Sequence, residues 1–162
     1  MTLFQQVLMN EMATVQLGAQ LAQSIQAPCV IYLSGPLGAG KSVLVRSMLQ
    51  ALGIQGPIKS PTYALVESYK YSSYSVYHFD FYRFSGENEW EECGFRDYFN
   101  ENSLCFIEWA EKAVAQLPTA DLEISLNYLD NPLKNNDYIG RRISIQAKTQ
   151  CGAVLLCNLK EI

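Results

Sequence analysis

The sequence predicts an α/β domain in which helices and a mixed parallel and antiparallel sheet form three layers. Two parts of the chain carry this prediction. Residues 29–33 form a short apolar run that is followed by a glycine-rich loop and a helical repeat, an order typical of α/β proteins. Residues 122–128 and 142–146 alternate apolar and polar side chains, which is typical of antiparallel strands with one face in water. The sheet is therefore expected to contain both kinds of strand pair.

Size and composition are those of one globular domain. The chain has 162 residues, of which 49% are hydrophobic and 17% charged, so we expect residues 1–162 to fold as a single domain. The net charge of −4 argues against direct, non-specific binding of nucleic acid, which favours a basic face. An acidic protein can still act on nucleic acid through a partner.

The cysteines and the N-terminus indicate a cytoplasmic protein. The five cysteines are scattered, odd in number and without a C-x-x-C pair, so a disulfide framework is not expected and a reducing compartment fits. The first residues lack the basic start of a signal peptide, and no apolar run approaches the ~20 residues of a membrane span. We therefore expect no membrane association.

Local signals divide the first third of the chain into helix, strand, loop and helix. The first helix is expected to begin after Asn10, a favourable N-cap, and to run to about Gln26, because Pro28 follows. The apolar run described above is the first predicted strand. The second helix is predicted over residues 43–52, where apolar residues recur at helical spacing ahead of Gly53.

Turn residues and apolar runs predict the remaining elements. In chain order these are strands over 62–69 and 75–84 joined by a hairpin at 71–74, short helical turns within 87–99, a strand over 104–107, a helix over 109–117 ended by Pro118, and the two alternating strands joined by a turn at 130–132. Residues 153–159 are ambiguous between a helix and an edge strand.

The glycine-rich loop carries the most specific chemical signal. Residues 35–42, Gly-Pro-Leu-Gly-Ala-Gly-Lys-Ser, match the phosphate-binding pattern G-x-x-x-x-G-K-[ST]. The glycines allow a tight turn whose N–H groups point into one concavity, Lys41 brings a positive charge to the β- and γ-phosphates, and Ser42 offers a hydroxyl to Mg²⁺. A glycine-rich turn that contains Lys-Ser by chance is the competing interpretation, and the flanking strand and helix count against it. The prediction is a P-loop NTPase-like domain.

Two acidic residues at the ends of predicted strands are candidates for holding Mg²⁺ and ordering the attacking water. Glu108 follows four apolar residues and is the better match to a Walker B strand, whereas Asp80 ends the apolar part of another strand. A solvated or ion-paired carboxylate is the competing interpretation of each, and the sequence leaves open which one contacts the metal. His78 shares a strand face with Asp80 and can position water or act as a base, but a hydrogen-bonded histidine on a half-buried strand is favoured.

Two further segments are ambiguous. Ser60-Pro-Thr-Tyr63 combines two hydroxyls with a stiffening proline, and it fits a γ-phosphate-sensing segment and a simple turn equally well. Six tyrosines fall between Tyr63 and Tyr82. Core and edge packing is the favoured interpretation of this run, and an exposed aromatic interface for a protein is the other.

Four short motifs together resemble a known family. They are Leu37-Gly-Ala-Gly-Lys-Ser42, Ser60-Pro-Thr-Tyr63, His78-Phe-Asp-Phe-Tyr-Arg83 and Ile107-Glu-Trp-Ala-Glu111. Their order and spacing resemble the bacterial TsaE (YjeE) family, the small ATPase of tRNA threonylcarbamoyladenosine biosynthesis. The first motif is generic to phosphate-loop proteins, whereas the His-Phe-Asp-x-Tyr-Arg and Glu-Trp motifs are much more specific. The similarity extends from about Glu11 to the strand at Arg142.

The resemblance implies an activity and partners. The nucleotide would be ATP, bound with Mg²⁺, and its hydrolysis would support turnover of the TsaB and TsaD proteins. Those partners would transfer the threonylcarbamoyl group to the adenosine next to the anticodon. Contact with tRNA would be indirect, through that complex.

The resemblance also implies roles for individual residues. Lys41, Asp80 and Glu108 would be catalytic, with Asp80 needed for hydrolysis, and Ser42 and Glu108 would ligate Mg²⁺. Residues 60–62 would form a switch-like loop. The nucleotide-binding set would comprise Thr14 near the adenine, Gly35, Gly38, Ala39, Gly40, Lys41, Ser42, Ser60, Pro61, Thr62, and Trp109 beside the nucleotide or the partner surface.

Three alternatives stand beside a partner-dependent ATPase. A small-molecule kinase usually needs several arginines on a mobile lid, but after Arg96 the sequence has only Arg141 and Arg142. A GTP switch would need an Asn-Lys-x-Asp motif, and residues 127–130 lack its lysine. An ATP-gated scaffold with negligible hydrolysis is compatible with the same motifs, because ATP would order residues 60–62 and so bias docking to a partner.

Overall fold

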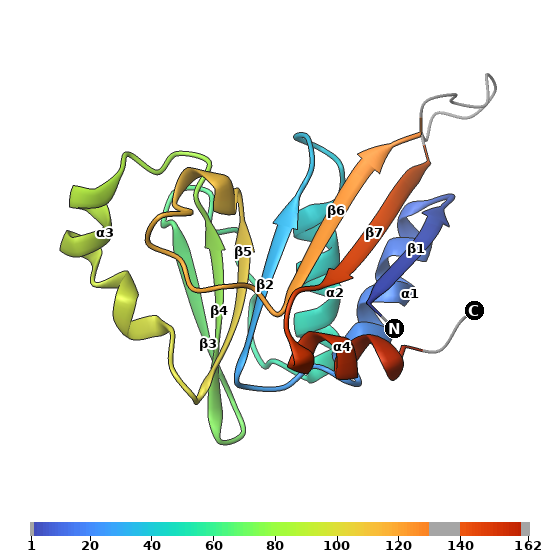
Figure 1. Ribbon diagram of the computed structural model, residues 1–162, viewed down its shortest axis with the longest axis horizontal. Helices are drawn as coiled ribbons and strands as arrows, with labels where there is room; N and C mark the ends of the chain where they lie inside the picture. The colour runs from blue at the N-terminus through green and yellow to red at the C-terminus, as the bar shows by residue number, and fades with distance from the viewer. Residues whose placement is uncertain (1, 130–139, 160–162) are drawn as a thin grey trace.

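The computed structural model describes residues 2–129 and 140–159, which form a seven-stranded sheet flanked by helices (Figure 1). The strands are β1 (Leu3–Leu8), β2 (Cys29–Ser34), β3 (Val66–Tyr71), β4 (Tyr74–Asp80), β5 (Ser103–Glu108), β6 (Leu122–Tyr128) and β7 (Arg141–Ala147). The helices are α1 (Glu11–Ala22), α2 (Lys41–Leu52), α3 (Glu87–Cys93) and α4 (Gln150–Cys157), with the 3₁₀ turns η1 (Phe95–Tyr98) and η2 (Ala110–Lys112).

The sheet is parallel in its centre and antiparallel at both edges, in the order β1-β7-β6-β2-β5-β4-β3. Strand β2 pairs in parallel with β5 and β6, and β4 pairs in parallel with β5. The edges are built by β3 against β4 and by β7 between β6 and β1, all antiparallel. The predicted mixed sheet is confirmed.

Strand β5 shows why the fold has three layers. All six of its residues are buried, and alternate side chains enter different hydrophobic clusters. Leu104 and Phe106 belong to the core under α1 and α2, while Cys105 and Ile107 belong to an aromatic cluster with Trp90 of α3. A strand covered on both faces reads as a continuous apolar run, as the sequence does here.

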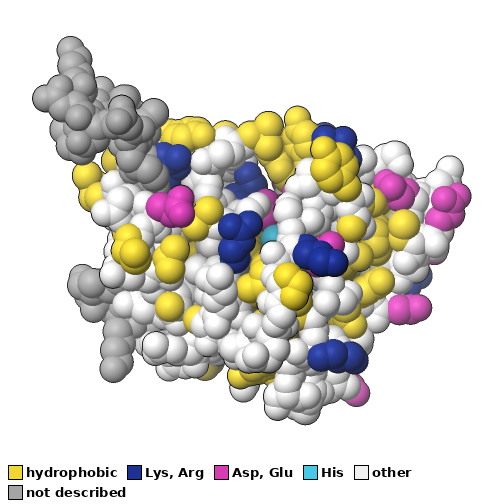
Figure 2. Space-filling view, turned by 180° about the vertical axis from the view of Figure 1, so that it is seen from behind, with side chains coloured by type: hydrophobic (Ala, Val, Ile, Leu, Met, Phe, Trp, Pro, Cys, Tyr) yellow, Lys and Arg dark blue, Asp and Glu magenta, His cyan; other side chains and the backbone are white. Residues whose placement is uncertain are grey.

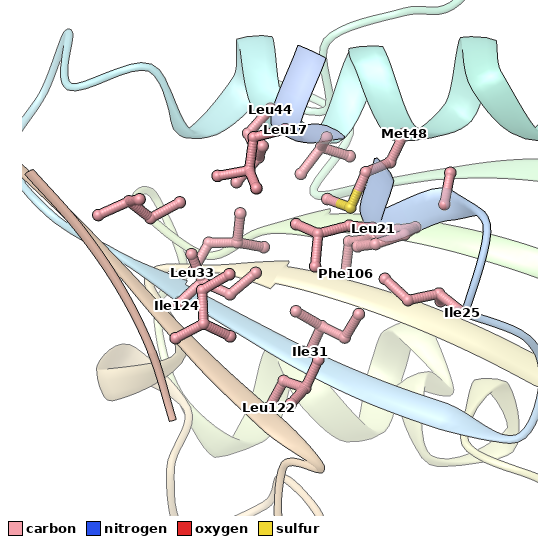
Figure 3. Packing of buried hydrophobic residues seen from close by; sticks show 14 of the residues in the cluster. Leu17, Leu21, Ile25, Ile31, Leu33, Leu44, Met48, Phe106, Leu122 and Ile124 are labelled. Atoms are coloured by element: carbon pink, nitrogen blue, oxygen red, sulfur yellow. The ribbon is translucent and has the colours of Figure 1, made fainter. Parts of the chain in front are cut away.

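The core between the sheet and helices α1 and α2 is packed by aliphatic side chains (Figure 3). Leu17 of α1 and Met48 of α2 lie over Ile31 of β2 and are completely buried. The two helices approach closely, since a Cβ placed on Gly18 would lie 1.8 Å from the Ser47 Oγ. Helix α4 packs against β7. None of the helices in the described residues combines the length and apolar character needed to span a bilayer.

Several predicted boundaries are confirmed. The Asn10 side chain caps α1 by accepting a hydrogen bond from the Ala13 N–H at 2.9 Å, although α1 ends at Ala22, earlier than expected. Gly53 ends α2 in the left-handed conformation, with φ 86°. The hairpin between β3 and β4, the short helical turns within 87–99 and the antiparallel β6–β7 pair are all present. The ambiguous C-terminal segment is helix α4.

Other predictions are wrong. Strand β3 begins at Val66 instead of 62, because Leu65 closes a turn with its N–H on the Pro61 carbonyl at 2.9 Å. Strand β4 ends at Asp80 instead of 84. The helix expected over 109–117 is reduced to η2, since Trp109 itself adopts the left-handed conformation. Strand β1 was not predicted at all, and the predicted turn at 130–132 lies outside the described residues.

Candidate functional site

The candidate site lies where the central parallel strands end. Strand β2 leads into the loop at 35–40, β5 ends at Glu108 and β4 ends at Asp80. The strand register pairs Leu33 with Glu108 and Glu108 with Asp80, so both acids stand beside the loop. This edge is where α/β proteins usually bind ligands. A cavity of about 410 Å³ opens here, lined by Leu37, Gly38, Gly40, Lys41, Ser42, Val43, Thr62, Asp80, Tyr82, Arg83, Glu108 and Trp109.

The surface around this cavity is chemically mixed. Figure 2 shows a hollow in which the histidine (cyan) lies near acidic and basic side chains, with hydrophobic side chains along the rim. The exposed hydrophobic residues of the region include Leu37, Tyr63 and Tyr82. The site therefore offers charge at its base and apolar surface at its mouth.

Glycine is required at the start of the loop. Gly35 has φ 135°, and a Cβ there would lie 2.1 Å from the Leu126 carbonyl oxygen. Gly38 also has positive φ, and its Cβ would lie 2.9 Å from the Tyr128 hydroxyl. Strand β6 thus approaches the loop so closely that side chains at these positions would collide with it. The loop then runs into the first turn of α2, whose free N–H groups favour anions.

Lys41 is the buried cation of the site. It is only 5% exposed, and its Nζ donates hydrogen bonds to the Gly35 and Pro36 carbonyls at 2.7 and 3.0 Å. The Nζ also lies 4.8 Å from the centre of the Trp109 ring. Burial lowers the pKa of Lys41, and the nearby Glu108 carboxylate acts in the opposite direction.

Glu108 joins the loop to the neighbouring strand. The Ser42 hydroxyl donates to Glu108 Oε1 at 3.0 Å, and the His78 Nε2 lies 2.7 Å from the same oxygen. Both His78 and Glu108 are buried. An ionised carboxylate can only accept, so this geometry places the histidine proton on Nε2. The favoured sequence interpretation of His78, a hydrogen-bonded strand histidine, agrees with its position, and its partner is Glu108.

Asp80 forms part of the cavity wall. Its Oδ1 accepts a hydrogen bond from the Tyr82 N–H at 2.9 Å, which fixes the orientation of the carboxylate. Burial raises the pKa of Asp80; the Tyr82 hydrogen bond lowers it and the Glu108 charge raises it further. The two acids are therefore held differently, Glu108 by side chains and Asp80 by the backbone that follows it.

Residues 60–62 begin a turn at the edge of the cavity, and their γ-phosphate-sensing role stays a prediction. The Ser60 and Thr62 hydroxyls share a hydrogen bond of 2.7 Å, and Pro61 is buried and starts the turn that ends at Leu65. This is a simple turn in form. Thr62 nevertheless lines the cavity, so the segment borders the space that a ligand would occupy.

Trp109 has an uncommon backbone conformation for a large residue, with φ 57° and ψ 40°. Its ring packs against Tyr82 at 5.0 Å between centroids and lines the cavity. Trp109 is the cavity-lining member of the three described non-glycine residues with positive φ, the others being Leu65 and Ser72. The prediction that Trp109 starts a helix is wrong, and its predicted place beside a nucleotide or a partner stays a prediction.

Five of the predicted binding residues do not line the cavity: Thr14, Gly35, Ala39, Ser60 and Pro61. Thr14 is buried in α1 and 2% exposed. Its predicted contact with an adenine stays a prediction. Sequence reasoning also missed two residues that touch the loop, Tyr128 and Arg141, because no motif marks them and their position depends on the strand order.

Most of the chain is similar to proteins of one family. Residues 8–136 match the family model described as threonylcarbamoyl adenosine biosynthesis protein TsaE. The chain is 40% identical over 152 residues to the tRNA threonylcarbamoyladenosine biosynthesis protein TsaE of Haemophilus influenzae, with 91% of each chain covered. It is 38% identical over 125 residues to the protein of the same name from Rickettsia felis, which covers 76% of this chain and 72% of that one.

A solved structure shows the same fold. The crystal structure of YdiB from Bacillus subtilis aligns with a TM-score of 0.74 over 98% of this chain and 95% of the other. At 24% identity this likeness supports the fold alone. The family model and the sequence relatives cover most of the chain, and the chain therefore belongs to the TsaE family of tRNA threonylcarbamoyladenosine biosynthesis proteins.

Proposed function

We propose that the protein binds Mg²⁺ and ATP in this cavity and hydrolyses ATP to support turnover of a TsaB–TsaD complex that modifies tRNA. The observation that carries the proposal is the contact between Ser42 and Glu108 beside the buried Lys41. It joins a phosphate loop to the end of a neighbouring strand through two groups suited to one metal ion.

The residues present fit the proposed ligands. The Ser42 hydroxyl and Glu108 carboxylate are oxygen ligands within 3.0 Å of each other, and Mg²⁺ in nucleotide sites usually takes one or two such protein ligands together with phosphates. Lys41 supplies a buried positive charge next to them, with its ammonium held by loop carbonyls. The hydrogen bond of Ser42 to Glu108, and not to Asp80, favours Glu108 as the metal ligand.

Each residue has a role that follows from its surroundings. When bound, Mg²⁺ would neutralise charge on the phosphate oxygens. Lys41 would stabilise the same charge from the loop side, and His78 would hold Glu108 in a fixed orientation. Asp80, held by the Tyr82 N–H, would orient a water molecule from the cavity wall.

The arginines do not favour a kinase. Arg141 lies in β7 and donates hydrogen bonds to the loop carbonyls of Gly38 and Ala39, so it is already engaged outside any lid. Arg142 follows it in the same strand. An ATP-gated scaffold remains the second candidate, because Thr62 of the Ser60–Thr62 segment lines the cavity and gives a ligand a way to reshape that segment.

The test is steady-state ATP hydrolysis by the purified chain, alone and with a TsaB–TsaD pair. Glu108→Gln is the test variant, and Glu101→Gln is the matched control, because Glu101 is exposed and lies in the turn before β5, away from the cavity. We expect the pair to stimulate hydrolysis, and the stimulation to be lost in Glu108→Gln and kept in Glu101→Gln. If the protein binds nucleotide but hydrolyses none under any condition, the ATP-gated scaffold is the function that remains. Equal hydrolysis rates with and without the pair would overturn the partner-dependent ATPase.

A further inference from the structure

Five successive carbonyl groups of the loop are held by side-chain donors. Lys41 Nζ takes the first two, at Gly35 and Pro36, as described above. The Tyr128 hydroxyl donates to the Leu37 carbonyl at 2.8 Å. Arg141 donates from Nη2 to the Gly38 carbonyl at 3.2 Å and from Nε to the Ala39 carbonyl at 3.1 Å. Three of the five carbonyls are thus held from β6 and β7, outside the recognised motif.

Holding a carbonyl also orients the next amide. The peptide unit is planar and trans, so the C=O of one residue and the N–H of the next point in opposite directions. The bond from Tyr128 to the Leu37 carbonyl therefore fixes the N–H of Gly38, and the bond from Arg141 to the Ala39 carbonyl fixes the N–H of Gly40. The intervening N–H, of Ala39, closes a turn on the Pro36 carbonyl at 3.2 Å. The N–H groups of Gly38 and Gly40 therefore point away from Tyr128 and Arg141, as donors that line an anion-binding concavity would.

Tyr128 and Arg141 act as one unit. They are directly opposite each other in the β6–β7 register, and the Arg141 guanidinium lies 4.2 Å from the centre of the Tyr128 ring. We call them the Tyr128–Arg141 pair. The arginine uses two different nitrogen atoms on neighbouring carbonyls, which is a fork that a lysine ammonium cannot reproduce.

We propose that the Tyr128–Arg141 pair consists of positioning residues that hold the loop in the shape needed to receive a phosphate chain. The inference rests on the proposed function for its ligand. The pair acts through the loop backbone, from the side opposite to the phosphates, so its contribution is the order of the loop and not its charge. Without the pair, binding of phosphate would have to order the loop first and would lose affinity by that cost.

The first measurement uses the ligand-free protein. Backbone ¹⁵N order parameters of residues 37–40 are compared in the wild type, Tyr128→Phe and Arg141→Met. We expect them to fall from about 0.85 towards 0.6 in the variants, while those of α2 stay unchanged. A change confined to the loop is one that a general loss of stability does not produce. The matched controls are Arg142→Met, one residue further along β7, and Tyr74→Phe, at the opposite end of the sheet.

The second measurement is the affinity for ATP and for tripolyphosphate by calorimetry. We expect a loss of about tenfold in Tyr128→Phe and about 10- to 100-fold in Arg141→Met, with both controls within about threefold of the wild type. Arg141→Lys keeps the charge without the fork and is expected to resemble Arg141→Met.

The outcomes separate this inference from the proposed function. Arg141→Lys with wild-type affinity would overturn it, because charge alone would then suffice. Unchanged order parameters would overturn it as well. If the wild-type protein binds no ATP, the proposed function is wrong. The order parameters of the free protein and its binding of tripolyphosphate would still test whether the pair shapes a phosphate site.

Discussion

The two sides of the cavity are built from different interactions. One side, the loop at 35–42, is fixed by hydrogen bonds from Lys41, Tyr128 and Arg141. The other side, which we call the aromatic rim, consists of Tyr63, Tyr82, Arg83 and Trp109. Ring contacts hold this side together. The Arg83 guanidinium carbon lies 4.6 Å from the centre of the Tyr63 ring, and the ring centres of Tyr82 and Trp109 are 5.0 Å apart.

This difference teaches which side is suited to which task. Hydrogen bonds are directional and fix atoms closely, whereas ring contacts tolerate sliding. The loop is therefore suited to a ligand of constant shape, and the rim to one that changes or to a partner. Each acid is tied to one side, Glu108 to the loop through Ser42 and Asp80 to the rim through the Tyr82 N–H. We expect residues tied to the loop to control binding and residues tied to the rim to control turnover.

The largest effect is expected at Asp80. Asp80→Asn should slow partner-stimulated hydrolysis by about 10²- to 10⁴-fold, the usual range for loss of a general base or water-orienting group. ATP affinity should stay within about threefold of the wild type, since the loop keeps its bonds. Single-turnover kinetics and calorimetry check the two parts. A proportionate loss of binding would break the comparison, because Asp80 would then belong with the loop.

Two lysines compare the sides directly. Lys41→Ala should weaken ATP binding at least about 100-fold, because it removes a buried charge and two bonds to the loop. Lys112→Ala is the counterpart, with its Nζ 5.6 Å from the Tyr82 ring centre in the rim. Its affinity should change by less than about threefold, as expected for an exposed contact. Similar losses of ATP affinity in both variants would contradict the assignment of binding to the loop and turnover to the rim.

His78 tests the link between Glu108 and the sheet. His78→Ala removes one of the two side-chain donors to the buried Glu108 carboxylate, leaving Ser42, and should lower the free energy of unfolding by about 1–3 kcal/mol. His78→Gln carries a donor amide and should recover part of that loss. Urea unfolding measures both variants. Equal destabilisation by the two substitutions would mean that the ring packing, and not the hydrogen bond, stabilises this position.

The pH dependence of stability offers a subtler test. Because burial raises the pKa of Asp80 above its ordinary 3.8, the ionised carboxylate costs stability at neutral pH, and this cost disappears once Asp80 is protonated in both the folded and unfolded states. Asp80→Asn should therefore melt at a higher temperature than the wild type at pH 7. The difference should shrink as the pH falls through the raised pKa and vanish below pH 3.8. Thermal melts followed by circular dichroism would show it, and a constant difference at every pH would contradict the assignment.

The smallest effect is expected at Tyr63, which is 81% exposed. Tyr63→Ala should change the free energy of unfolding by less than about 0.5 kcal/mol, as is usual for surface positions. ATP binding by the isolated chain should also be unchanged. A selective loss of stimulation by the TsaB–TsaD pair would sharpen the comparison by assigning the rim to the partner.

Local sequence predicted where the loop lies in the fold, between a strand and a helix. The glycines, Lys41 and Ser42 fall within eight residues, so their pattern is recognisable without the fold. Glu108 was preferred to Asp80 because four apolar residues precede it, and the structure joins Glu108 to Ser42. Both acids come to the loop because parallel strands end at a common edge, which is a general rule of the fold class.

The remaining features depend on tertiary context. Tyr128 and Arg141 reach the loop only because β6 lies beside β2, and pairing order is not encoded in either strand alone. Strand β1 alternates in burial, but apolar Leu3 and Val7 lie on its exposed face, so its sequence does not alternate between apolar and polar residues. The helix expected after Glu108 does not begin at Trp109, because Trp109 has a left-handed backbone conformation that a helix cannot contain. In this conformation its ring packs against Tyr82 and Lys41, which are distant in sequence.

The two tryptophans of the chain give it a built-in optical reporter. Trp90 is 1% exposed and stacked among phenylalanines, whereas the indole of Trp109 forms part of the cavity wall with an ammonium group over its face. The emission of Trp90 should be constant, and that of Trp109 should respond to whatever enters the cavity or displaces Lys41. In a Trp90→Phe background, every change in tryptophan emission would come from Trp109, without an attached dye.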